Sequence, residues 1–256
     1  MKRIALVLIL LLVASVATAA FLDSAYRLPI IMYHSINHTS GTTGKTVVSP
    51  EALERQMRFL RERKYNVITL AEAVSYLSRK ARPPRNTVAI TIDDGYEDNF
   101  MYAYPILKKY RIPATIFIIV GHVGNAGFMR WDQIKEMSNS GLIDIESHTV
   151  HHPWLTGLGA QDLEQEMSES RKILEGNLGK KIRFLCYPMG CFNERVKQAA
   201  KNAGYEAAFG TKQTRLSANY DLYEIKRVRV SPTANNLFVF WIKLCGYHAF
   251  FKAMGS

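Results

Sequence analysis

Cysteine is scarce in this chain of 256 residues. Its three cysteines, Cys186, Cys191 and Cys245, are too few for the disulfide framework that stabilises many small exported domains. A bond between Cys186 and Cys191 is one alternative, but we expect two buried free thiols. The fold must therefore rest on a hydrophobic core, and a hydrophobic content of 48% with 21% charged residues is ordinary for a globular protein.

Long apolar runs are also missing. The longest candidate, residues 4–16, is shorter than the roughly 20 residues that span a bilayer. It follows the basic start Met-Lys-Arg and precedes the small residues of segment 17–20, so it predicts a secretory signal peptide over residues 1–20, with an uncleaved anchor as the alternative. No cysteine lies near the predicted cleavage site, which argues against a lipoprotein anchor. We expect a secreted or extracytoplasmic protein, with association with the cell surface as a further expectation.

Acidic residues are the minority, with 22 Asp and Glu against 33 Lys and Arg, and the formal net charge is +11. A basic exported protein is attracted to anionic phospholipid headgroups or wall polymers. Plain solvation of a charged surface explains the excess equally well. Nucleic acid is the competing partner, but the export signal argues against it, so we expect none.

Two short stretches carry most of the chemistry, Thr91-Ile-Asp-Asp-Gly95 and His148-Thr-Val-His-His-Pro153. The apolar run 87–92 is typical of a buried strand. Two carboxylates at the end of such a strand are costly unless something uses them. Three of the chain's seven histidines fall within the five residues 148–152. Together, the stretches indicate a metal hydrolase.

A zinc-like ion explains why these residue types are wanted together. With two imidazoles and one carboxylate as ligands, such an ion keeps one coordination position open for water. The ion lowers the pKa of that water to about 7. A second carboxylate that does not ligate can accept the proton. Asp93 and Asp94 can converge only where the strand ends and Gly95 allows a turn. His148 and His152, four residues apart, share one face of a helix or of a tight loop.

These stretches resemble the polysaccharide deacetylases of carbohydrate esterase family 4, the NodB-homology fold. The first family motif, T-F-D-D-G, is matched by residues 91–95, and the second, H-[ST]-x-x-H-P, by residues 148–153. The resemblance implies Asp93 as the general base. It also implies that one divalent metal ion is held by Asp94, His148 and His152. Zinc is the expected ion, with cobalt and nickel as alternatives.

The third family motif, commonly R-x-P-[YF]-G, is altered to Cys186-Tyr-Pro-Met-Gly190. Cys186 stands at the arginine position and Met189 at the aromatic position. An oxyanion site made by a backbone N–H near Tyr187 or Met189 tolerates this change, because the donor belongs to the main chain. Trp154, just beyond the second motif, could stack on a sugar ring, although a core position is the slightly favoured alternative.

Two further catalytic groups have to come from elsewhere. In the family the missing arginine orients the catalytic aspartate, and here the substitutes are Arg227 and Arg229, of which we favour Arg227. The late L-x-H motif that supplies the general acid is absent. Residues 29–35 resemble the opening strand of the branch that includes the poly-β-1,6-N-acetylglucosamine deacetylases, in which a histidine at this place protonates the leaving group. We therefore predict His34 as the acid.

Strand-like and helix-like segments alternate along the chain, which implies a mainly parallel sheet with helices outside it. The family fold is an irregular (β/α)7 barrel, and we expect this α/β architecture as a single domain over residues 21–234. The predicted site residues follow strands, and the rim at the carboxyl ends of strands is where barrels build active sites. For residues 235–256 we predict a closing helix, with a membrane-interface segment as the alternative.

The predicted function is that of an exported, metal-dependent de-N-acetylase of an N-acetylglucosamine polymer, with poly-β-1,6-N-acetylglucosamine as the favoured substrate. A peptidoglycan or chitooligosaccharide deacetylase is the alternative within the same class. A catalytically impaired carbohydrate-binding homologue is the alternative of another class, favoured by the missing arginine and late histidine. The complete metal set argues against it.

Overall fold

The computed structural model describes residues 28–38, 46–211 and 221–246. The predicted signal peptide, residues 39–45 and 212–220, and the end of the chain lie outside the described residues. Within the described part, no helix is both long and apolar enough to cross a membrane.

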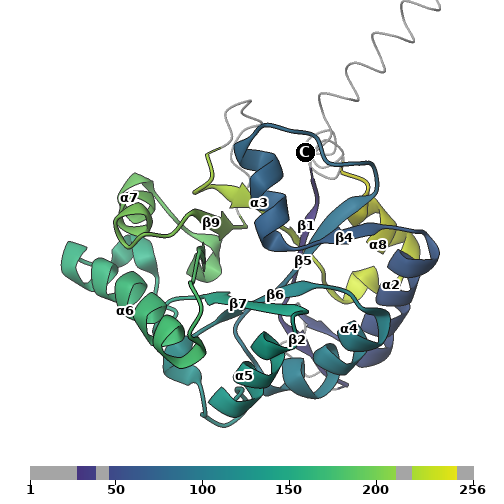
Figure 1. The fold of residues 1–256 in the computed structure, drawn as a ribbon, viewed down its shortest axis with the longest axis horizontal. Helices are drawn as coiled ribbons and strands as arrows, with labels where there is room; N and C mark the ends of the chain where they lie inside the picture. The colour runs from purple at the N-terminus through teal and green to yellow at the C-terminus, as the bar shows by residue number, and fades with distance from the viewer. Residues whose placement is uncertain (1–27, 39–45, 212–220, 247–256) are drawn as a thin grey trace, which may run out of the picture.

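A parallel sheet of nine strands forms the centre of the molecule (Figure 1). Its order is β10-β9-β8-β7-β6-β5-β1-β11, with β4 paired beside the start of β5. The strands are β1 (Ile30–Tyr33), β4 (Asn66–Ile68), β5 (Thr87–Ile92), β6 (Ala114–Ile118), β7 (Ile143–Ser147), β8 (Phe184–Cys186), β9 (Ala207–Gly210), β10 (Ile225–Lys226) and β11 (Val228–Arg229). Two short strands, β2 (Ser35–Ile36) and β3 (Val47–Val48), form a separate pair.

The sheet closes on itself through one short segment of chain. β10 and β11 stand at opposite ends of the strand order, yet only Arg227 separates them in the sequence. Ile225 pairs with Phe209 of β9, and Val228 pairs with Ile31 of β1. Segment 225–229 therefore joins the two edges of the sheet, and the expected irregular barrel is confirmed.

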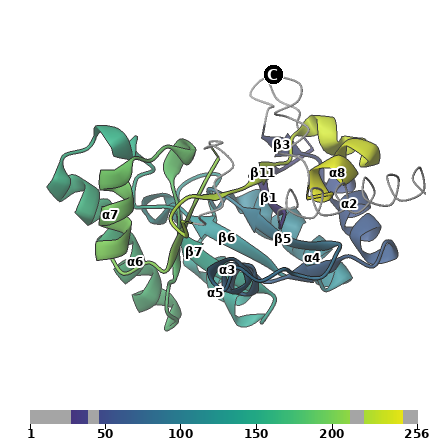
Figure 2. The same ribbon diagram turned by 90° about the horizontal axis from the view of Figure 1, so that it is seen from above.

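Helices surround this sheet (Figures 1 and 2). They are α2 (Pro50–Glu62), α3 (Leu70–Ser78), α4 (Tyr104–Tyr110), α5 (Trp131–Asn139), α6 (Ala160–Leu178), α7 (Glu194–Asn202) and α8 (Leu237–Leu244). Single helical turns are η1 (Asn99–Ala103, a π turn), η2 (Val120–His122), η3 (Leu155–Gly157), η4 (Pro188–Gly190) and η5 (Pro232–Asn235). Ser49 caps α2 through the amide of Ala52, as its position before Pro50 predicts.

Burial explains why the central strands are apolar along their whole length. All six residues of β5 are buried, as expected for a parallel strand covered on both faces. Alternate side chains separate into two clusters: Ile90 belongs to the cluster shared with the outer helices, and Ala89 to a cluster of strand residues with α3. Such alternation leaves the strand ends as the place where polar groups can converge.

The alternation of strands and helices that the sequence predicts is present in the structure. Tyr96, directly after the first motif, forms an isolated bridge with Phe128, and the helical segment that follows includes the π turn η1. Cys186 and Cys191 are free and buried, which confirms that expectation.

Part of the predicted closing segment is helix α8, which packs on α2. Phe240 is buried, and its ring lies 6.1 Å from the ring of Phe59 on α2. Phe238 and Trp241 remain exposed on the outer face of α8. The membrane-interface alternative stays a prediction, and residues 247–256 lie outside the described residues.

Candidate active site

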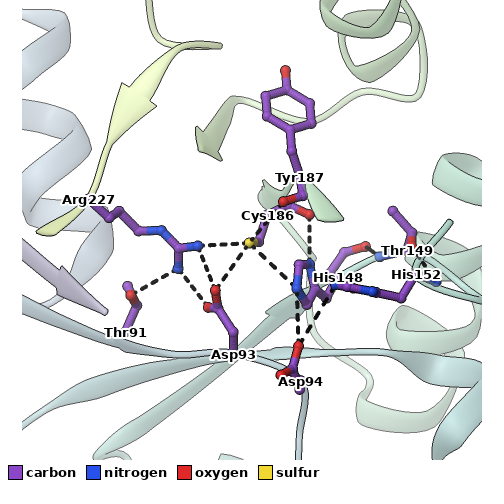
Figure 3. Close-up of polar contacts among 10 residues, drawn as sticks. Thr91, Asp93, Asp94, His148, Thr149, His152, Cys186, Tyr187 and Arg227 are labelled. Atoms are coloured by element: carbon purple, nitrogen blue, oxygen red, sulfur yellow. Dashed lines mark hydrogen bonds and ion pairs between the residues drawn. The ribbon is translucent and has the colours of Figure 1, made fainter. Parts of the chain in front are cut away.

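Two adjacent carboxylates lie at the carboxyl end of β5 and face different partners (Figure 3). β5 ends at Ile92, and the backbone then turns through positive φ angles of 77° at Asp94 and 80° at Gly95. The predicted turn is therefore made by Asp94 as well as by the glycine. Asp93 faces Arg227, whereas Asp94 faces two histidines.

Arg227 and Asp93 form a buried bidentate ion pair. Both guanidinium N–H groups donate to the two carboxylate oxygens at 2.6 Å, and one also donates to the Thr91 hydroxyl at 3.0 Å. Burial alone would raise the pKa of Asp93, but the charge and hydrogen bonds of Arg227 outweigh it and lower the pKa to about 2. Arg229, the other candidate, is exposed. The structure thus brings Arg227, and not Arg229, to the aspartate.

Cys186 fills the position beside this pair. Its sulfur accepts a hydrogen bond from Arg227 at 2.9 Å and lies 3.5 Å from a carboxylate oxygen of Asp93. Burial raises the pKa of the thiol above its usual value, so the group remains neutral at neutral pH.

Asp94, His148 and His152 form the group that the second motif predicts. One oxygen of Asp94 lies 3.4 Å from Nε2 of His148 and 3.9 Å from Nε2 of His152. One ligand atom from each of the three residues lies within 4.8 Å of the others. The histidines stand on a tight loop and not on a helix, because the residue after His148 has a φ of 67° and His152 a φ of 57°.

The donor set fits a divalent metal ion. Nδ1 of His148 is hydrogen-bonded to the carbonyl oxygen of Cys186 at 2.8 Å, so Nε2 is left as the acceptor that faces Asp94. Burial lowers the pKa of His152 below its usual value, which keeps this imidazole in the neutral form that binds metal. Two imidazoles and one carboxylate suit a zinc-type ion with an open position.

A second geometric grouping, Asp93, His148 and Cys186, fits a cation less well. Both oxygens of Asp93 already accept hydrogen bonds from the Arg227 guanidinium. A metal ion at that position would face a fixed positive charge at close range. We therefore assign the candidate metal site to the Asp94 group.

His34 stands beside Asp93 because β1 and β5 are neighbouring parallel strands. Tyr33 pairs with Ile92, and the Asp93 amide donates to the Tyr33 carbonyl at 3.0 Å, so the next residue on each strand emerges at the same rim. Burial lowers the pKa of His34 despite the nearby Asp93 and Asp94 carboxylates, so its protonated form is a stronger acid than a free imidazolium.

One of the two backbone donors predicted in the third motif is already used within the sheet. The Tyr187 amide donates to the Phe209 carbonyl at 2.9 Å within the sheet, and its side chain is buried. The Met189 amide, by contrast, has no acceptor among the described residues, and its φ is 54°. Of the two predicted oxyanion donors, the geometry favours Met189. Trp154 is 55% exposed, so the core alternative for it is wrong and the surface position remains open to a sugar.

Several supporting residues were missed by the sequence analysis. Glu166 on α6 contacts the histidine loop, and Asn99 donates to the His34 carbonyl at 2.8 Å. Near Asp94, the Tyr96 ring stacks on Phe128 at 5.1 Å, and burial together with Asp94 raises the pKa of Tyr96 to about 12. Adjacency to the first motif was the available signal for Tyr96, since it directly follows Gly95.

Comparison with known proteins agrees with this site. The family model for polysaccharide deacetylase matches residues 80–208. The Bacillus subtilis protein YxkH is 39% identical over 206 residues, which cover 80% of this chain and 72% of that protein. The poly-β-1,6-N-acetyl-D-glucosamine N-deacetylase of Staphylococcus aureus is 34% identical over 200 residues, 73% of this chain and 69% of that enzyme. The chain therefore belongs to the polysaccharide deacetylase family.

The fold is shared with solved members as well. The Streptococcus pyogenes deacetylase PplD in complex with acetate matches with a TM-score of 0.76 at 30% identity, over 83% of this chain and 96% of that one. The predicted family, hydrolase class and barrel are confirmed. The roles of the individual site residues remain predictions.

Replacing Arg227 tests the buried pair. In Arg227→Ala the Asp93 carboxylate stays buried without its counter-charge, so we expect the free energy of unfolding to fall by about 3–5 kcal/mol in urea denaturation. Arg229→Ala removes an exposed charge two residues away and should change it by less than about 0.5 kcal/mol. Equal free energies of unfolding for the two variants would show that the Asp93–Arg227 pair does not stabilise the fold.

Proposed function

We propose that this protein is an exported, metal-dependent de-N-acetylase of a β-linked N-acetylglucosamine polymer, with poly-β-1,6-N-acetylglucosamine as its substrate. The observation that carries the chemistry is the placement of the buried Asp93–Arg227 pair beside the group Asp94, His148 and His152. The similarity to the Staphylococcus aureus enzyme supports the choice of polymer.

We assign Asp94, His148 and His152 as the metal ligands, and zinc as the ion. A divalent cation held there would act as a Lewis acid toward the attacking water and the acetamide carbonyl. The neutral His152 and the orientation of His148 by the Cys186 carbonyl favour binding through both imidazoles.

Asp93 is the general base of this proposal. The Arg227 pair keeps the carboxylate ionised and fixes its orientation, so it is ready to accept a proton from the water that attacks the acetamide carbon. As the carbon–oxygen bond forms, negative charge develops on the carbonyl oxygen. The free Met189 amide is the backbone donor that we assign to this oxygen.

His34 is the general acid. When the carbon–nitrogen bond breaks, the leaving amine needs a proton, and protonated His34 at the end of β1 supplies it. The products are acetate and a glucosamine residue of the polymer. Trp154, exposed beyond the histidine loop, offers a face on which a neighbouring sugar can stack.

Acetate release is the direct test. With a β-1,6-linked N-acetylglucosamine oligomer we expect release that a chelator abolishes and that Zn²⁺ or Co²⁺ restores, because the Asp94 group needs its cation. Activity that survives complete metal removal would refute the metal-dependent mechanism. Peptidoglycan and chitooligosaccharides are assayed in parallel, and faster release from either would replace the proposed substrate. Binding of oligomers without release from any would favour the impaired carbohydrate-binding homologue.

The role of His34 predicts a dependence on the leaving group. We expect His34→Gln to lower kcat on the amide substrate by about 10²–10⁴-fold, since protonation of the amine is lost. On an aryl acetate ester, whose leaving group departs without a proton, kcat of the variant should fall much less. His38→Gln is the matched control, because the His38 side chain is 55% exposed and pairs with the exposed carboxylate of Glu51. Equal losses on amide and ester would exclude His34 as the acid.

Export is supported by the sequence of residues 1–20. We expect the protein recovered from the culture medium or cell surface to lack these residues, with cleavage after Ala19 or Ala20. Intact-mass measurement of the recovered protein checks this. A full-length chain held in the membrane fraction would show the uncleaved anchor, and a full-length chain in the cytoplasm would end the export proposal.

A further inference from the structure

A buried glutamate on α6 supports the loop that carries both histidines of the candidate metal site. Glu166 is only 9% exposed. One of its carboxylate oxygens accepts the backbone amides of Val150 and His151, each at 2.9 Å. The other lies 2.6 Å from Nδ1 of His151. Burial of a carboxylate is costly unless its oxygens are satisfied, and here the loop backbone satisfies them.

The loop between the two histidines needs such support. Thr149 and His152 both have positive φ angles, a conformation that residues other than glycine adopt only when their surroundings impose it. The loop makes one internal bond, from the His152 amide to the Thr149 hydroxyl at 3.1 Å. The amides of Val150 and His151 lie between these two positions and point at Glu166.

Helix α6 holds the start of the loop as well. Ser170, one turn beyond Glu166, hydrogen-bonds the Ser147 hydroxyl at 2.8 Å. The same Ser147 hydroxyl accepts the Thr149 amide at 3.3 Å. On the opposite side, the Gly121 amide donates to the Val150 carbonyl at 2.9 Å. The loop is thus fixed from two sides, and Glu166 is the one charged group among these contacts.

We propose that Glu166 is the positioning residue of the metal site, which holds His148 and His152 at the spacing that metal binding requires. This inference rests on the metal site of the proposed function. Glu166 acts through the loop backbone and touches neither the ligand atoms nor the substrate. Without it, the strained loop relaxes and the imidazoles must be reordered when the ion binds, which weakens the affinity.

Metal affinity of the otherwise intact protein is the direct measurement. Metal-free protein is titrated with Co²⁺, followed by the visible absorption of the bound ion and by calorimetry. For Glu166→Ala we expect affinity about 10–100-fold weaker than wild type, the range typical for loss of a group that orients metal ligands. For Glu166→Gln we expect a loss of less than about tenfold, since one carboxamide oxygen can still accept both amides.

Two control variants separate this role from general effects. Glu169→Ala removes an exposed carboxylate from the same helix and should leave the affinity unchanged. His151→Ala removes a ring that is 72% exposed while leaving its backbone amide in place, and should also bind Co²⁺ nearly as wild type does. If His151→Ala loses as much as Glu166→Ala, the ring contact and not the backbone clamp is responsible, and the inference is overturned.

A second readout is independent of metal. Hydrogen exchange of the Val150 and His151 amides in the metal-free protein should be faster in Glu166→Ala than in Glu169→Ala. If Glu166→Ala does not fold, Glu166→Asp replaces it, because its shorter side chain withdraws the carboxylate from both amides and should weaken binding in the same direction. If the folded variant binds Co²⁺ with wild-type affinity, the inference about Glu166 is overturned and the proposed metal site stands. Failure of the wild-type protein to bind Co²⁺ overturns both the metal site and this inference.

Discussion

The ion pair between Arg227 and Asp93 joins the closure of the barrel to its chemistry. Arg227 is the single residue between β10 and β11, so it lies where the two edges of the sheet meet. Asp93 follows β5, on the far side of β1 from that seam. The two hydrogen bonds at 2.6 Å therefore tie the closing segment to a central strand. A buried pair of this kind stabilises only while both charges are present, so the fold and the orientation of the proposed base depend on each other.

Four of the eight non-glycine residues that have positive φ angles in the described part of the chain lie in the same region. Asp94, Thr149, His152 and Met189 all have positive φ angles, although none is glycine. Strain of this kind persists only where the surrounding structure imposes it, and it is common at sites that bind or react. Here it aims two proposed metal ligands inward and leaves the Met189 amide without an acceptor among the described residues. The hydrogen bonds from α6 and from the neighbouring strands offset its cost.

Features encoded within a few neighbouring residues could be predicted from the sequence. The apolar run of β5 and the acidic pair after it placed Asp93 and Asp94 at the rim, and the family motifs paired them with the histidines. Residues that depend on tertiary contacts were harder. Arg227 and Arg229 are two residues apart in the same strand-like run, so the sequence alone does not tell which of them is buried. Closure of the barrel buries Arg227 and leaves Arg229 exposed. Glu166 interrupts the buried stripe of α6 beside Leu163 and Met167, a signal that is visible but does not reveal its partner.

The position of Arg227 leaves no carboxylate oxygen of Asp93 free for an arginine at position 186 of the altered third motif. Both oxygens of Asp93 are already taken by one guanidinium, so an arginine at position 186 would bring a second positive charge to the same carboxylate. Two arginines at these positions are therefore alternatives and not partners. The neutral thiol of Cys186 instead fills the space between Arg227 and Nε2 of His148, which lies 3.8 Å from the sulfur. Arg227 reaches Asp93 from the closing segment, so its charge lies on the far side of Asp93 from the proposed metal ligands. In this position the guanidinium orients the base without opposing the binding of a cation.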